Sequence, residues 1–143
     1  MRHLSCFFLI LLITPLARAE ELPTAFLADF VVGRYHLIGR QADGETTYQG
    51  RVDILRDAKN TLRVRRTIGS RTIEGTAAIE TATLAETQVL RVRFTEAGAP
   101  FECTCLIQGD LDNYARLSCL RYRRDGRTRQ PSLEALFHAA DDR

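Results

Sequence analysis

The sequence predicts a small all-β domain in which seven or eight antiparallel strands follow one another as an up-and-down meander and close into a barrel. Short segments of alternating apolar and polar residues recur along the chain, and turn-forming residues separate them. Hairpins centred on these turns keep one face of every strand pair apolar. Closure is expected because an open meander with one buried face leaves two edge strands exposed.

Seven strands and two short flanking helical segments are expected. Thr24 is a candidate N-cap for a helix over 25–28, and Ser132 for a second helix near the C-terminus. The second helix would place four apolar residues on one face: Leu133, Leu136, Phe137 and Ala140. An eighth strand, if the barrel has one, would come from either the N-terminal segment or residues 126–131. The seven strands lie near 31–40, 46–55, 61–68, 71–80, 87–95, 100–108 and 113–123.

Two glycine-containing turns set the hairpin registers in the first half of the chain. Asp43-Gly44 suits a two-residue type I′ turn, and Gly69-Ser70 suits a type II′ turn with glycine first. Hairpins centred on these turns bring apolar residues together and place opposite charges across from one another. The expected pairs are Leu37 with Gly50, Tyr35 with Val52, Arg34 with Asp53, Val64 with Gly75, and Arg65 with Glu74.

Two further bends extend the same inner face. A bend at 57–59 is expected to join the second and third strands, and a loop around Gly98 the fifth and sixth. The first bend pairs Ile54 with Leu62, Val52 with Val64, and Gly50 with Arg66. The second loop pairs Phe94 with Phe101, Val92 with Cys103, and Leu90 with Cys105.

Residues 1–19 have the pattern of a cleaved signal peptide, so residues 20–143 form the expected single domain. Arg2 and His3 precede an apolar run over 4–13, and Ala17-Arg18-Ala19 supplies small residues before the cleavage site. The run is shorter than the ~20 residues of a membrane-spanning helix. We divide the domain into a barrel core at 30–123 and a tail at 124–143, and expect a periplasmic or extracellular protein.

Composition and motifs favour a protein that acts by binding. Removing Arg2 and Arg18 with the leader leaves 18 basic and 18 acidic residues. A net charge near zero gives no general attraction to nucleic acid. The sequence contains no Gly-x-Ser-x-Gly, no His-Glu-x-x-His and no phosphate-binding glycine loop. We therefore expect no enzyme, no cofactor, no nucleic-acid partner and no stable membrane insertion.

Three cysteines follow the leader, and an oxidising compartment lets two of them pair. Cys103 and Cys105 alternate on one strand and point to the same inner face. A hairpin symmetric about Leu111 places Cys119 opposite Cys103, at a separation that suits a disulfide. We predict a Cys103–Cys119 disulfide and a free thiol at Cys105. A thiolate metal site is the alternative, but no fourth ligand lies nearby, so no metal is expected.

Arg66 is the candidate binding residue inside the barrel. Alternation along 61–68 sends Arg66 inward with Leu62 and Val64, and a buried guanidinium needs a partner. Tyr35 and Tyr48 project from nearby strands and could supply hydroxyl groups. Arg66 would then anchor the carboxylate of a small apolar or amphipathic ligand. Alternatively, Arg66 lies near a barrel end and extends its charged group to water.

A basic cluster surrounds the turn at Asp125-Gly126. It is either a solvated strand end with its turn or a surface for an anionic partner such as lipid headgroups or an acidic protein. Its members are Arg121, Arg123, Arg124, Arg127 and Arg129.

Residues 31–80 combine glycines with alternate apolar residues in one run. The run comprises Gly33-x-Tyr35-x-Leu37-x-Gly39, Asp43-Gly44, Tyr48-x-Gly50-x-Val52-x-Ile54, Leu62-x-Val64, Ile68-Gly69 and Gly75-x-Ala77. It resembles small exported bacterial β-barrel proteins of the calycin (lipocalin-like) type. The opening Gly-x-Tyr is similar to the Gly-x-Trp of true lipocalins, although this chain has no tryptophan.

The resemblance implies a barrel that binds. The first hypothesis is a carrier or sensor of a small, largely apolar ligand. The second is a protein-interaction module, such as an inhibitor or an envelope assembly factor, that would use its loops or residues 20–29 to contact another exported protein.

Overall fold

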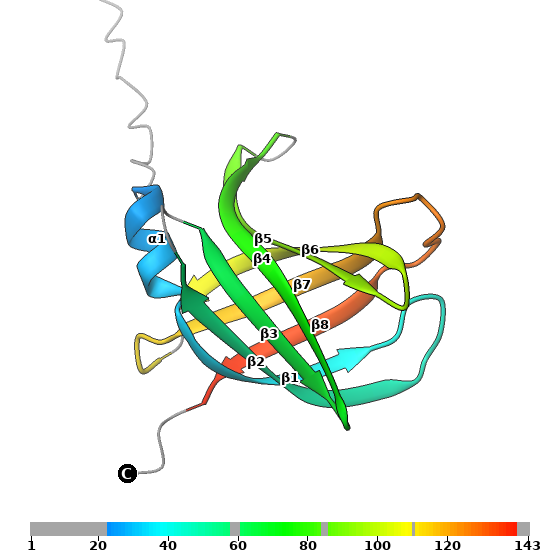
Figure 1. Cartoon of the computed structure of the whole chain (residues 1–143). Helices are drawn as coiled ribbons and strands as arrows, with labels where there is room; N and C mark the ends of the chain where they lie inside the picture. The colour runs from blue at the N-terminus through cyan, green and yellow to red at the C-terminus, as the bar shows by residue number, and fades with distance from the viewer. Residues whose placement is uncertain (1–22, 58–60, 84–85, 110, 140–143) are drawn as a thin grey trace, which may run out of the picture.

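The computed structural model describes residues 23–57, 61–83, 86–109 and 111–139, which form a closed eight-stranded antiparallel barrel with one short helix (Figure 1). Each strand pairs with the next along the chain, and the last strand pairs with the first. The fold class predicted from the sequence is therefore confirmed. The expected signal peptide lies outside the described residues. The elements are α1 (Thr24–Phe30), β1 (Gly33–Arg40), β2 (Thr47–Arg56), β3 (Leu62–Ile68), β4 (Arg71–Ala82), β5 (Thr87–Glu96), β6 (Ala99–Gly109), β7 (Ala115–Arg123) and β8 (Ser132–His138).

The eighth strand comes from residues that the sequence assigned to a helix. β8 pairs with both β1 and β7, so that Leu136 lies between Leu37 and Leu117. The helix capped by Ser132 and both expected sources of an eighth strand are wrong, and the tail is partly barrel. Without β8, the backbone groups along one side of β1 and of β7 would be unpaired. Pairing them outweighs the helix propensity of the local sequence.

Helix α1 lies at the end of the barrel where β1 begins (Figure 1). Thr24 is its first residue rather than its cap, because Pro23 occupies the N-cap position and no side chain caps the helix. The helix buries Leu27 and Ala28. Arg56 at the end of β2 donates from Nε to the carboxylate of α1 residue Asp29 at 2.8 Å, which ties the helix to the barrel.

Three of the five expected hairpin registers are confirmed, those of β1–β2, β3–β4 and β5–β6. Gly69 has a φ of 58°, which the first position of a type II′ turn requires. The β1–β2 loop is not the expected type I′ turn, because Asp43 has a positive φ and Gly44 does not. A hydrogen bond of 2.8 Å from the Gln41 N–H to the Thr46 carbonyl closes a wider loop with the same centre, so the register is unchanged.

The β2–β3 register differs from the expected one by two residues. Val52 pairs with Arg66 rather than with Val64, because the strands are joined by five residues, 57–61, where a tighter bend was expected. A shift of two positions leaves every side chain on its face. Arg66 therefore still points inward, but Gly50 is not its partner across the strands.

The β6–β7 hairpin is also offset by two residues, and this changes the disulfide. Cys105 lies directly opposite Cys119, with 4.0 Å between their Cα atoms, and the two form the disulfide. Cys103 lies opposite Arg121 and is the buried free thiol. The predicted Cys103–Cys119 bond with a free Cys105 is therefore wrong. The five-residue connection at 110–114 is centred one position beyond Leu111, so partners move by two.

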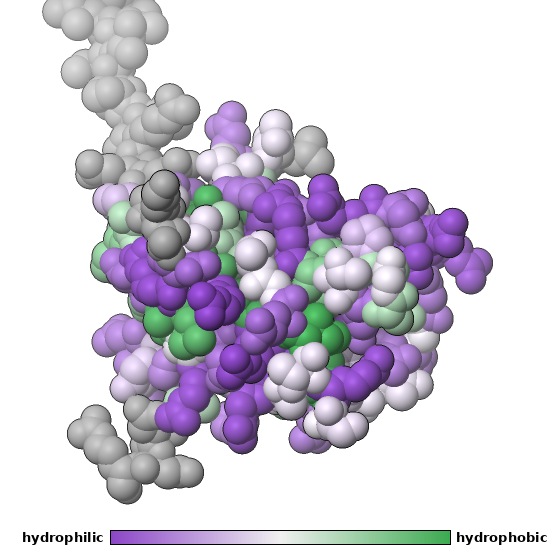
Figure 2. Space-filling view, in the orientation of Figure 1, coloured by the Kyte–Doolittle hydropathy of each residue, from purple (hydrophilic) through white to green (hydrophobic). Residues whose placement is uncertain are grey.

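Arginine–carboxylate pairs cover much of the outer face of β4–β7. Arg93 donates to Glu80 at 2.5 and 2.9 Å and to Glu102 at 2.8 Å. Arg91 and Tyr122 donate to the same Glu102 carboxylate at 2.9 and 2.6 Å. Burial alone would raise the pKa of Glu102, but Tyr122 and the two arginines lower it. Figure 2 shows that the face formed by β2, β3 and β4 is also largely hydrophilic, with apolar residues in small separate groups.

We predict that replacing both Cys105 and Cys119 by serine lowers the free energy of unfolding by about 3 kcal/mol, because the bond closes a short loop in the unfolded chain. Urea denaturation followed by circular dichroism measures this difference. The control is Cys103→Ala, which should keep the disulfide and the corresponding two-hydrogen mass deficit in non-reduced protein. Loss of that deficit in Cys103→Ala would show that Cys103 is a disulfide partner.

Candidate functional site

Arg66 of β3 forms an ion pair with Glu134 of β8 inside the barrel. Its two terminal nitrogens donate to the two carboxylate oxygens at 2.9 and 2.7 Å. The two side chains are 4% and 0% exposed. The inward direction predicted for Arg66 is confirmed, but Glu134 was missed because its segment was assigned to a helix. The signal that could have found Glu134 was the alternation of Ser132, Glu134 and Leu136. As a strand, this segment places Glu134 on the inner face, where the buried Arg66 needs a charged partner.

Tyr48 of β2 joins this pair through its hydroxyl group. The hydroxyl donates to Glu134 and lies 2.9 Å from the Ser132 hydroxyl. Ser132 in turn donates to the Arg40 carbonyl at 2.6 Å. A Cβ atom at Gly39 would overlap the Tyr48 ring, so a glycine there lets the ring lie against β1. Burial, followed by the charge of Glu134, raises the pKa of Tyr48 to about 12, which keeps the hydroxyl protonated.

The Arg66–Glu134 pair is charged. Burial is the largest influence on the Glu134 carboxyl and would raise its pKa, but the charge and hydrogen bonds of Arg66 and the Tyr48 hydroxyl lower the pKa below its ordinary value. Burial would also lower the pKa of the Arg66 guanidinium, and Glu134 raises it instead. Each group thus holds the other in its charged form, as a buried ion pair with a hydrogen-bonded geometry does.

Two stacked phenylalanine rings extend from the Arg66–Glu134 pair toward the end of the barrel opposite α1. The Arg66 guanidinium lies 5.0 Å from the Phe94 ring centroid, and the Phe94 and Phe101 rings stack at 5.8 Å. The Arg121 and Arg123 guanidinium groups lie 4.7 and 5.9 Å from the Phe101 ring centroid. Each of the two rings is thus within cation–π distance of at least one arginine.

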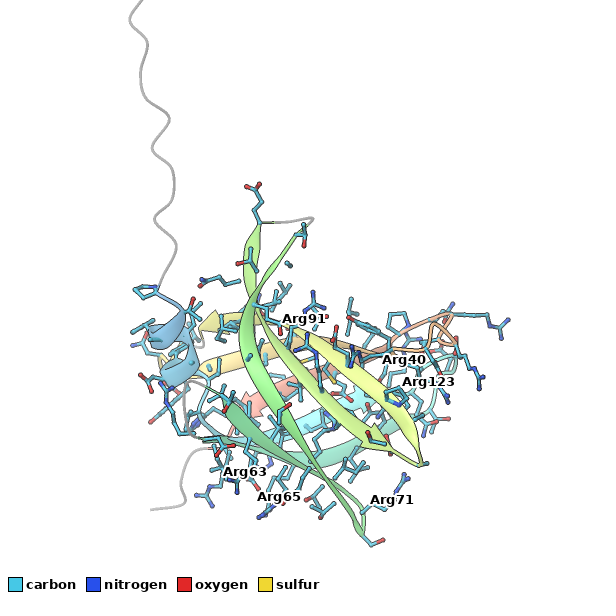
Figure 3. All side chains as sticks on the ribbon, turned by 45° about the horizontal axis from the view of Figure 1, so that its top comes forward. Arg40, Arg63, Arg65, Arg71, Arg91 and Arg123 are labelled. Atoms are coloured by element: carbon cyan, nitrogen blue, oxygen red, sulfur yellow. A yellow bond between two sulfur atoms is a disulfide. The ribbon has the colours of Figure 1, made fainter. Side chains whose placement is uncertain are left out.

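A pocket of about 370 Å³ lies at the end of the barrel opposite α1, and we call it the mouth pocket. Tyr48, Ile68 and Phe101 contribute its inner wall from the strands, and the loops at 41–43 and 127–128 contribute to its rim. Figure 3 labels Arg123 and Arg71 at this part of the barrel. The complete lining is Gln41, Ala42, Asp43, Tyr48, Ile68, Arg71, Glu96, Ala97, Ala99, Phe101, Arg121, Arg123, Arg127 and Thr128.

Positive charge exceeds negative charge in the lining of the mouth pocket. It contains four arginines but only two carboxylates, Asp43 and Glu96. Glu96 lies 3.4 Å from Arg71 and 3.5 Å from Arg121, and its Oε2 has no hydrogen-bond partner among the described residues. The Asp43 carboxylate is held by the backbone N–H groups of Arg129 and Gln130 at 3.1 and 2.7 Å. Arg123 and Arg127 lie 2.6 and 3.7 Å from the Asp125 carboxylate, so each of the four arginines is within ion-pair distance of a carboxylate. An anion from solution would bind among these pairs, where arginines outnumber carboxylates.

The basic cluster predicted from the sequence divides between the pocket and the surface. Arg121, Arg123 and Arg127 line the mouth pocket. Arg121 is only 16% exposed, so it is not part of a solvated turn. Arg124 lies 4.0 Å from Glu102 on the outer face. The description as a solvated strand end and turn thus fits Arg124 and Arg127, which are exposed, but not Arg121.

The structure separates the three candidate ligand-binding residues. Arg66 and Tyr48 share Glu134 as a partner, and Tyr48 also lines the mouth pocket. Tyr35 instead lies toward α1, where its hydroxyl donates to the Val31 carbonyl at 2.8 Å. Arg66 already has an internal carboxylate where the ligand carboxylate was expected, and Tyr35 supports the packing of the chain after α1.

The free Cys103 thiol is buried beside the charged pair. Burial, followed by the charge of Glu134, raises the pKa of Cys103 to about 12, so it remains a thiol at neutral pH. The disulfide occupies the sulfur atoms of Cys105 and Cys119, which removes them from the alternative metal site. No group of three or more metal-ligating side chains that could hold an ion lies in the described part of the chain.

Comparison with known proteins assigns no relative: no family model matches the chain, and no curated protein matches it. The described residues also include no helix that is long and apolar enough to cross a membrane.

We predict that Glu134→Gln lowers the free energy of unfolding by about 3 kcal/mol, because it leaves the Arg66 charge buried without its counter-ion. Urea denaturation at neutral pH measures the loss. The matched control is Glu45→Gln, which removes an exposed partner of Arg40 and should change stability by no more than about 0.5 kcal/mol. Equal losses in the two variants would contradict the importance of the buried pair.

The same pair predicts a dependence of stability on pH. The folded-state pKa of Glu134 lies below its unfolded value, so its contribution is present above the unfolded pKa, about 4.3, and is lost as the pH falls through the folded pKa. Wild-type stability should therefore fall more steeply than that of Glu134→Gln in this acid range. Parallel acid-unfolding curves for the two proteins would count against this assignment.

Proposed function

We propose that this protein is an exported, calycin-like binding barrel that holds a small anionic molecule in its mouth pocket. The observation that carries the proposal is the convergence of four arginines on a pocket of about 370 Å³. Such a volume is within the range of small-molecule sites, roughly 300–1,000 Å³. We assign binding without catalysis, in line with the absence of catalytic motifs from the sequence.

The lining suggests a ligand with two chemical parts. Arginine donors form charge-assisted hydrogen bonds with carboxylate, sulfate or phosphate groups, so Arg71, Arg121 and Arg123 suit the anionic part. Phe101 and Ile68 on the inner wall suit a compact apolar or aromatic part. Tyr48 adds a hydroxyl group that its raised pKa keeps protonated.

The mouth pocket suits the anionic group of the ligand better than the position of Arg66 does. Both terminal nitrogens of Arg66 are bonded to Glu134. A ligand carboxylate at Arg66 would displace Glu134 and leave it as an uncompensated buried charge, which is strongly unfavourable. Arg66 therefore supports the site indirectly, by holding the carboxylate that orients Tyr48.

Export to the periplasm or the extracellular space is part of this proposal. The pattern of residues 1–19 supports it, and the Cys105–Cys119 disulfide is compatible with an oxidising compartment.

Native mass spectrometry of protein purified from an export-competent host tests for a captured ligand. We expect additional mass on the folded protein that disappears on denaturation. Clean apo mass, together with no stabilisation by any anion described below, would favour a filled barrel that acts as an interaction module.

We predict that benzoate, sulfate or phosphate raises the melting temperature of the wild-type protein, because binding to the folded state stabilises it. Arg121→Gln should weaken the binding by about tenfold or more, since it removes a charged hydrogen-bond donor from the pocket. Thermal-shift titration with each anion measures the change. Arg63→Gln, on the outer face of β3, is the control and should bind like the wild type. Equal binding by the wild type and Arg121→Gln would overturn the assignment of this pocket.

A further inference from the structure

The outer face of β8 is apolar, in contrast to the arginine–carboxylate pairs on the outer face of β4–β7. Every outward residue of β8 is apolar, and the neighbouring β1 and β7 add Ile38 and Leu120. Ile38 is 53% exposed and Leu133 47% exposed. In the strand registers, Ile38 lies beside Ala135, and Leu120 lies beside Leu133. We call this set the β8 ridge: Ile38, Leu120, Leu133, Ala135 and Phe137.

Two arginines, Arg51 and Arg116, lie on either side of the β8 ridge at the level of Phe137. The registers place Arg51, His36, Phe137 and Arg116 side by side on β2, β1, β8 and β7. Arg51 and Arg116 are exposed, and neither has an ion-pair partner in the described part of the chain. None of the outward residues of β1, β7 and β8 is acidic.

Arginines elsewhere on the outer wall are paired with carboxylates. Arg65 donates to Glu74 at 3.1 Å, and Arg93 donates to Glu80 and Glu102. The ridge therefore differs in two respects, because it lacks acidic residues and because its apolar side chains are exposed together. The exposed apolar side chains favour a partner with an apolar region, and the unpaired arginines beside them favour a partner that carries negative charge around that region.

We propose that the β8 ridge docks this protein reversibly on an anionic lipid surface. The apolar side chains would enter the boundary between headgroups and acyl chains, while Arg51 and Arg116 would lie at the level of the lipid phosphates. An anionic leaflet attracts basic residues in this way, and salt weakens the attraction. The contact is peripheral, because it involves one side of the barrel wall.

A lipid surface fits the ridge better than a protein does. Two copies of this chain meeting through the ridge would bring unpaired arginines together, and no outward residue of β1, β7 or β8 is acidic to neutralise them. The wall of a closed barrel is convex and offers no free strand edge for an added strand. A lipid surface deforms around a convex apolar ridge and supplies negative charge on both sides of it.

Docking through the ridge is independent of the proposed ligand site. The mouth pocket lies at the barrel end between the loops, whereas the ridge lies on the wall formed by β1, β7 and β8. The pocket would therefore remain open to solution when the ridge contacts a membrane.

Co-sedimentation of the exported protein with vesicles tests this inference. We expect binding to vesicles of phosphatidylcholine mixed with phosphatidylglycerol, weaker binding at high salt, and little binding to phosphatidylcholine alone. The double variant Arg51→Gln/Arg116→Gln should lose roughly 25-fold in affinity, about fivefold for each arginine. The double variant Ile38→Ser/Phe137→Ser should also lose binding while retaining the disulfide and the barrel circular-dichroism spectrum.

Two controls separate the ridge from other surfaces. Leu55→Ser/Arg65→Gln removes one exposed apolar residue and one exposed arginine from β2 and β3, outside the ridge, and should bind vesicles like the wild type. Arg121→Gln should also bind vesicles like the wild type, although its binding of anions in the mouth pocket is weakened. The inference is overturned if the wild type does not bind anionic vesicles, which would redirect attention to an acidic protein partner. It is equally overturned if either control loses as much binding as the ridge variants.

Discussion

The ion pair between Arg66 and Glu134 is the constraint on which the rest of this barrel depends. A guanidinium inside a small apolar core is acceptable only with a charged, hydrogen-bonded partner, and that partner comes from the last strand of the chain. β8 must therefore be a strand in one register, with Glu134 facing inward. The same strand closes the barrel, so closure and charge neutralisation are satisfied together.

The pair also divides the barrel interior into two parts with different properties. Toward α1 the interior is apolar, with fully buried residues such as Ile54, Leu62 and Leu90. Toward the loops it becomes polar, through Tyr48 and then the arginines of the mouth pocket. The Phe94–Phe101 stack lies between a buried and a partly exposed guanidinium. Arginine can bind a carboxylate and lie on an aromatic ring at the same time, which suits a chain whose only lysine is Lys59.

The hairpin registers show which local signals are reliable. Registers were right where a turn residue needed a special backbone conformation, as at Gly69 and Gly98. They were wrong by two residues at the five-residue connections 57–61 and 110–114, which contain no glycine to mark the turn in the sequence. A shift of two keeps inward residues inward, so the inner face was right even where the partners were wrong. The disulfide depends on a specific partner, and it was therefore assigned to the wrong cysteine.

The amino-acid sequence by itself determined the all-β class, the inner face of each of the first seven strands and the inward direction of Arg66, because alternation and turn chemistry act between near neighbours. It also showed that arginines surround the turn at Asp125, but it did not indicate which of these arginines line a pocket. Only the tertiary structure decided that 132–138 is a strand, that Glu134 pairs with Arg66, and that Cys105 bonds with Cys119. The first two outcomes depend on closing the barrel, which brings residues far apart in the sequence together and overrides local helix propensity. The third depends on the register of the β6–β7 hairpin.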